Sequence, residues 1–151
     1  MRKRLPLLRQ IQADRTGAAL VEFALVAPMF IVALLGVVQA GLYVQNYNAV
    51  RNVVGDAARF AEVEYQKGNK LDSDMLQDRV QAIAASGLYN LPDTSTLITV
   101  TEAATRISGV REMTISINAN PPVLVPWVAG YTPQIDYSRD VFLYDPDALA
   151  G

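Results

Sequence analysis

Two residue types with reactive side chains, cysteine and histidine, are missing from this 151-residue chain. Without cysteine the chain has no thiol nucleophile and no disulfide, and without histidine it has no imidazole base and no typical zinc site. A serine nucleophile would have no histidine to activate it, and the sequence contains no glycine-rich phosphate loop. We therefore expect a protein that is not an enzyme, with no catalytic residues, no metal site and no cofactor.

Charge is scarce in one long stretch near the N-terminus. Between Arg15 and Arg51 the only formally charged residue is Glu22. About 20 apolar residues, each rising 1.5 Å along a helix, span the roughly 30 Å hydrocarbon core of a bilayer. The sequence therefore predicts a transmembrane helix over residues 18–43. Pro28 lies inside it and removes one helical hydrogen bond, so we expect a kink or a locally loosened turn there.

The charges on either side of this stretch predict its orientation. Residues 1–17 hold five basic residues and one acidic residue, which gives them a formal charge of +4. Because the net charge of the whole chain is −2, the remaining residues carry −6. The positive-inside rule places residues 1–17 in the cytoplasm and the acidic remainder outside. No basic patch exists outside residues 1–17, so we expect no nucleic-acid partner.

Glu22 occupies a costly position. A carboxylate in the middle of a bilayer costs about 3 kcal/mol on insertion scales, and this cost falls toward zero at the headgroups. Two interpretations follow: either Glu22 lies at the headgroup level, or it has a positively charged partner. The surrounding pattern favours the second, because a basic segment ends in Gly17, Glu22 follows five residues later, and an aromatic residue, Phe23, comes next.

This pattern resembles the class III signal of type IV pilin-like proteins. In those proteins a prepilin peptidase cuts after the glycine, and the fifth residue of the mature chain is glutamate. The resemblance implies a cut between Gly17 and Ala18, which makes residues 1–17 a cleaved leader and Glu22 the fifth mature residue. Cutting would create an ammonium group at Ala18, about 6 Å along the helix from Glu22. A carboxylate and an amine of neighbouring subunits could neutralise each other, with Glu22 and Phe23 setting the register of assembly.

A longer motif narrows the family. It reads Gly-Ala-Ala-Leu-Val-Glu-Phe-Ala-Leu-Val-Ala-Pro from residue 17 to 28, followed by Gly36, Gly41 and Ala-Ala-Arg-Phe-Ala at residues 57–61. It is similar to the TadE-like pseudopilins of tight-adherence (Flp) pilus systems. The resemblance implies a minor pseudopilin of the bacterial inner membrane that takes part in pilus assembly and can enter the pilus itself. The implied partners are the prepilin peptidase, the inner-membrane assembly platform, other TadE-, TadF- and TadG-like pseudopilins and the Flp major pilin.

Two other fates of the N-terminus remain open. Residues 1–17 could be retained, which would make the chain a signal-anchored extracytoplasmic binding module. A secretory cleavage before Gly41, after the small residues Val38 and Ala40, would instead release a soluble domain.

The sequence of the outer part, residues 44–151, predicts an α+β domain. Apolar residues recur at helical spacing from Tyr43 to Ala61, so the first helix should continue to about residue 66 and stop near Gly68. A second helix is expected over residues 73–86, after an N-cap at Asp72 and Ser73. Strands are expected at 97–101, 113–117 and 134–143, forming a small antiparallel sheet against the long helix. The proline-rich segment 118–133, which contains Trp127, should be a loop.

Overall fold

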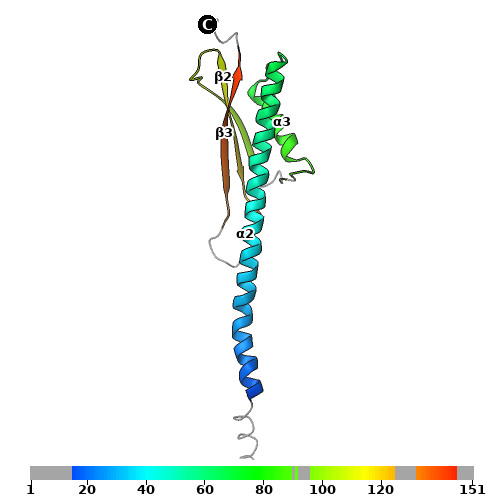
Figure 1. Cartoon of the computed structure of the whole chain (residues 1–151), viewed down its shortest axis with the longest axis vertical. Coiled ribbons are helices and arrows are strands. Elements are labelled where there is room, and N and C mark those ends of the chain that lie inside the picture. Colours follow the sequence, from blue (N-terminus) through cyan, green and yellow to red (C-terminus); the bar gives the residue numbers. More distant parts are fainter. Residues whose placement is uncertain (1–14, 90, 92–95, 125–131, 146–151) are drawn as a thin grey trace, which may run out of the picture.

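A computed structural model describes residues 15–89, 91, 96–124 and 132–145. Helix α2, Arg15–Gln66, runs without interruption from the apolar segment into the outer domain (Figure 1). Its 52 residues correspond to about 78 Å at 1.5 Å per residue. The predicted long helix is confirmed, and it continues through Pro28, whose expected kink stays a prediction. The predicted loop residue Trp127 lies outside the described residues.

Local chemistry explains where α2 ends and where α3 begins and ends. After α2, Gly68 adopts a φ of +84°, a conformation that favours glycine, and the chain turns away from the helix axis. The second helix, α3, is Ser73–Ala84. Its N-cap is Asp72, whose Oδ1 accepts a hydrogen bond from the Met75 amide at 2.7 Å, as predicted. The helix ends two residues earlier than predicted, because Ala85 is the C-cap.

The three predicted strands form one antiparallel sheet in the order β1-β2-β3. They are β1 Thr96–Ala103, β2 Val110–Ala119 and β3 Ile135–Tyr144. Ile115 of β2 lies opposite Val100 of β1 and Arg139 of β3, which fixes the register. Along β2, alternate residues Met113, Ile115 and Ile117 are fully buried, so one face of the sheet is the apolar one.

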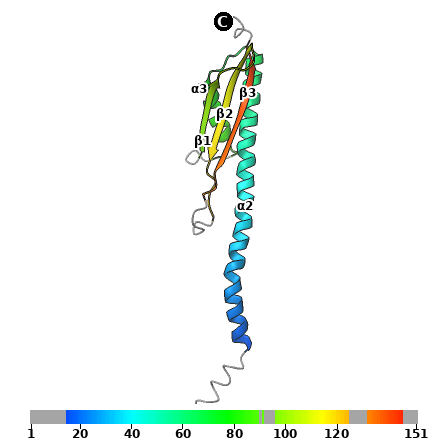
Figure 2. The same ribbon diagram turned by 90° about the vertical axis from the view of Figure 1, so that its left-hand side faces the viewer.

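The core lies between this face and the two helices. The sheet forms one layer, and α3 with the outer half of α2 forms the other (Figure 2). From α2 the core receives the fully or almost fully buried residues Val50, Val53, Val54, Ala57, Ala58 and Ala61. The architecture is therefore α+β, as predicted: a long N-terminal helix, one short helix and a small antiparallel sheet.

Candidate functional site

The N-terminal half of α2 carries an apolar surface that nothing in the described structure covers. Its large apolar side chains are exposed, from 45% for Val32 to 75% for Val37. The segment is long and apolar enough to cross a membrane, and none of its most apolar 18-residue window is buried. This single apolar helix is consistent with a single-pass membrane anchor. An exposed apolar surface of this size indicates contact with lipid or with other apolar helices.

The residues of the predicted processing site lie in the first turns of this helix. The bond between Gly17 and Ala18 lies two residues after Arg15, the first described residue of α2. Glycine weakens a helix by up to about 1 kcal/mol relative to alanine. A Cβ added at Gly17 would meet no atom within 4 Å. The fold itself therefore does not require glycine at this position.

Glu22 and Phe23 lie one turn farther along and are both exposed. Ala18 and Glu22 are four residues apart, so they share one face of α2. Among the described residues Glu22 has no ion-pair partner. A partner for this carboxylate must therefore come from another molecule, from residues outside the described ranges, or from water at the headgroups.

A polar contact that the sequence did not predict interrupts this exposed surface. Gln39 is only 4% exposed, although it follows the exposed Val38. Its Nε2 donates a hydrogen bond to the Pro122 carbonyl at 3.1 Å, and its Oε1 accepts one from the Leu124 amide at 2.8 Å. We call this interaction the Gln39 contact. The available sequence clue was a single amide inside an otherwise apolar run.

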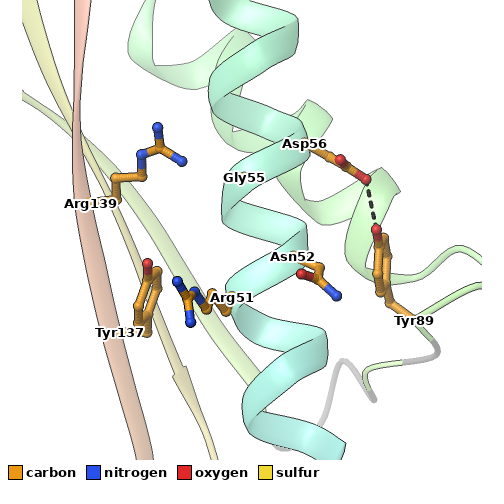
Figure 3. Close-up of a pocket in the computed structure, with 7 residues that line it drawn as sticks. All are labelled: Arg51, Asn52, Gly55, Asp56, Tyr89, Tyr137 and Arg139. Carbon is orange, nitrogen blue, oxygen red and sulfur yellow. Dashed lines mark hydrogen bonds between the residues drawn. The ribbon is translucent and has the colours of Figure 1, made fainter.

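An open cavity of about 690 Å³ lies farther along α2 (Figure 3). Arg51 on α2 and Arg139 on β3 line it, and their guanidinium groups lie on the β3 side of the helix. Neither arginine has a carboxylate partner among the described residues. On the opposite side, the Tyr89 hydroxyl donates to Asp56 Oδ2 at 2.7 Å, which raises the pKa of Tyr89. The two free cations could contact an anionic group of a ligand or a partner.

Two other arginines of the domain, Arg106 and Arg111, form ion pairs that hold parts of the sheet together. Arg111 binds the carboxylate of Glu102 on the neighbouring strand and also donates to the Leu71 carbonyl at 3.1 Å. The hydrogen bonds from Arg111 hold the pKa of Glu102 below its usual value. Arg106 binds Glu112, which is 3% exposed, and its pKa is raised by that bond. These pairs have a structural role, because each joins two parts of the sheet or its loops.

Within the described ranges, no group of three or more acidic side chains is placed to hold a metal ion.

Comparisons with curated proteins and with solved structures each gave no match. A family model described as TadE-like protein matches residues 17–59. The match covers the exposed half of α2 and most of its buried half, and it begins at the glycine of the predicted processing motif. Residues 17–59 are thus similar to TadE-like proteins, in agreement with the resemblance that the N-terminal motif indicated.

Proposed function

We propose that this chain is a minor pseudopilin, that a prepilin peptidase processes it, and that it takes part in assembly of a tight-adherence type IV-like pilus. The observation that carries the proposal is the uncovered apolar half of α2, with one carboxylate, Glu22, near its start. Such a surface is stable in lipid or against other apolar helices, which are the two environments of a pilin-like helix before and after assembly. The TadE-like match over the same residues supports this role.

In this proposal three residues have distinct roles. Gly17 is the residue after which the peptidase cuts, and Ala18 becomes the new N-terminus. Glu22, on the same helical face and about 6 Å along the axis, pairs with the ammonium group of a neighbouring subunit. Because each unpaired charge is costly among apolar helices, the pair favours one register of packing over others.

The proposal also fixes the orientation and the partners. The leader, residues 1–17, lies in the cytoplasm, and the domain of residues 44–151 lies on the extracytoplasmic side of a bacterial inner membrane. The chain is a substrate of the peptidase and not itself an enzyme. Its partners are the assembly platform, related TadE-, TadF- and TadG-like pseudopilins and the Flp major pilin.

The N-terminal residue of the protein purified from native membranes tests the proposal directly. We expect intact mass and terminal peptide sequencing to show a chain that starts at Ala18. A start at Met1 would contradict processing, and a start at Gly41 would indicate a soluble secreted domain.

A variant at the cleavage site sharpens this test. Gly17→Leu should accumulate as the uncut precursor, because a bulky side chain obstructs the approach of the peptidase to the backbone. The fold tolerates the change, since no atom lies within 4 Å of the added Cβ. Gly36→Leu is the matched control, because it adds the same side chain at another unobstructed glycine of α2 and should be cut normally. Normal cutting of Gly17→Leu would refute the site.

A second candidate function is a signal-anchored extracytoplasmic binding module that keeps its leader. The cavity lined by Arg51 and Arg139 favours it, because two guanidinium groups with no carboxylate partner in the described part of the chain suit an anionic ligand. Retention of Met1 in native membranes, together with loss of binding to an acidic peptide in Arg51→Ala, would support this function over the first.

A further inference from the structure

The Gln39 contact limits how deep α2 can enter a membrane. It joins the helix to residues 120–124, which form neither helix nor strand. Pro122 is exposed, and Leu124 is 40% exposed. Irregular backbone that faces lipid does not occur in the hydrocarbon core, because water is absent there to satisfy its polar groups. The hydrocarbon core must therefore end before Gln39.

We propose that the extracytoplasmic surface of the bilayer crosses α2 at Gln39, and that the Gln39 contact holds residues 121–124 against the lipid headgroups. This inference rests on the membrane insertion included in the proposed function. The span then covers residues 18–38, and these 21 residues measure about 31 Å, close to the roughly 30 Å of a hydrocarbon core. The span therefore ends about five residues earlier than the limit at residue 43 that the sequence predicts, and the outer domain lies correspondingly closer to the membrane surface.

The position of this boundary also determines the depth of Glu22. Glu22 precedes Gln39 by 17 residues, or about 26 Å, so it lies about 4 Å inside the cytoplasmic edge of a 30 Å core. The backbone at residue 15 precedes Gln39 by about 36 Å, which lies beyond the cytoplasmic edge of a 30 Å core. A boundary at residue 43 would instead place Glu22 about 32 Å away, outside the core. The Gln39 boundary thus gives Glu22 a partial desolvation cost that a neighbouring ammonium group can relieve.

The absence of native cysteine permits a clean test with the full chain. We would introduce Ala33→Cys, Val37→Cys, Gly41→Cys and Val44→Cys singly, all at exposed positions of α2. Each variant would react with a membrane-impermeant maleimide in spheroplasts, and again after solubilisation in detergent to normalise the rates. We expect Gly41→Cys and Val44→Cys to react at least tenfold faster than Ala33→Cys and Val37→Cys.

Two other outcomes overturn the proposal in distinguishable ways. Protection that extends through Gly41→Cys, with only Val44→Cys reactive, would move the boundary to residue 43 and leave membrane insertion intact. Equal reactivity at all four positions would show that α2 is not inserted, which removes the proposed function as well.

A second variant tests the contact itself. Gln39→Leu in the Gly41→Cys background removes both hydrogen bonds and extends the apolar run, so labelling at position 41 should slow about tenfold. Gln45→Leu is the matched control, because Gln45 is exposed and makes no hydrogen bond through its side chain among the described residues. Unchanged labelling in Gln39→Leu would overturn the role of the Gln39 contact.

Discussion

The two halves of α2 share one secondary structure and have opposite surroundings. From Leu20 to Val38 the large apolar side chains are exposed, whereas from Val50 to Ala61 the apolar residues on one face are completely buried. The second half has its own sheet and α3 to cover it, and the first half has no cover in the described structure. The outer half is thus covered by its own domain, whereas in the proposed function the inner half is covered by lipid or by other subunits.

An aspartate placed in either half of α2 should show whether that half is needed for the stability of the outer domain or for membrane insertion. The substitution in the outer half has the largest expected effect of the variants considered. Val54→Asp puts an unpaired charge into a fully buried site, so the free energy of unfolding should fall by at least about 4 kcal/mol. Because the free energy of unfolding of a whole domain is only about 5–15 kcal/mol, this loss removes a large share of it and should lower the melting temperature of the outer domain strongly. Circular dichroism melting of the full chain in detergent measures this.

Val32→Asp is the matched variant in the inner half. Its side chain is exposed, so the melting of the outer domain should not change. Membrane insertion should weaken by about 3 kcal/mol, since this is the cost of a mid-bilayer aspartate. Equal melting temperatures of Val54→Asp and Val32→Asp would contradict the claim that only the outer half of α2 contributes to the packing of the outer domain.

Removal of the one charge in the inner half tests assembly without touching the outer core. Glu22→Ala should insert normally or better and should still be cut, yet pilus assembly should fall about 5- to 150-fold. That range corresponds to the roughly 1–3 kcal/mol cost of leaving the neighbouring ammonium group unpaired. Sheared pili quantified by immunoblot provide the readout, with Glu22→Asp as a charge-retaining control. Unchanged piliation would remove the register role of Glu22.

A smaller effect is expected at the N-cap of α3, which covers the outer half of α2. Asp72→Ala removes the hydrogen bond to the Met75 amide and should lower the free energy of unfolding by about 1 kcal/mol. Asp72→Ser keeps a capping oxygen and should lose much less. Chemical denaturation of the two variants tests this, and an equal loss in both would show that the cap hydrogen bond is not the cause.

The smallest effect concerns the ion pair of Glu102 and Arg111 in the outer domain. Glu102 has a lowered pKa in the folded state, so its charge stabilises the fold above the pKa of the unfolded chain, and this contribution is lost as the pH falls. Glu102→Gln should cost less than about 1 kcal/mol at pH 7, because the pair is partly exposed. Near pH 3 the difference in unfolding free energy between the native chain and Glu102→Gln should be smaller than at pH 7. A difference that stays constant from pH 7 to pH 3 would contradict this assignment.

Much of the fold was predictable because its signals are local. The apolar run, the stop at Gly68 and the cap at Asp72 depend on neighbours in sequence, and the structure places all three as expected. The third strand was predicted to within one residue at each end. The first two strands were predicted too short, and β2 extends through the charged residues Arg111 and Glu112. Their pairing with Glu102 and Arg106 joins residues of different segments, and spacing along the chain does not indicate such partners.

The predicted processing motif could be recognised in the sequence because its residues are close together in the chain. The Gln39 contact and the cavity could not, because their residues are far apart in the chain. Gly17, Ala18 and Glu22 form a contiguous motif, and the family match begins at that motif. The Gln39 contact joins residues 83 positions apart, and the cavity with Arg51 and Arg139 joins a helix to the last strand. Only the packed fold brings these groups together.

The last strand, β3, packs directly against α2, although the two are far apart in sequence. Val141 and Leu143, close to the end of the described chain, complete the burial of the outer half of the helix. If the chain is exported starting from its N-terminus, as the proposed function requires, the helix that enters the membrane first obtains its final cover last. Until β3 has crossed, the apolar stripe from Val50 to Ala61 would remain open to premature association, so export and folding of this domain would have to finish together.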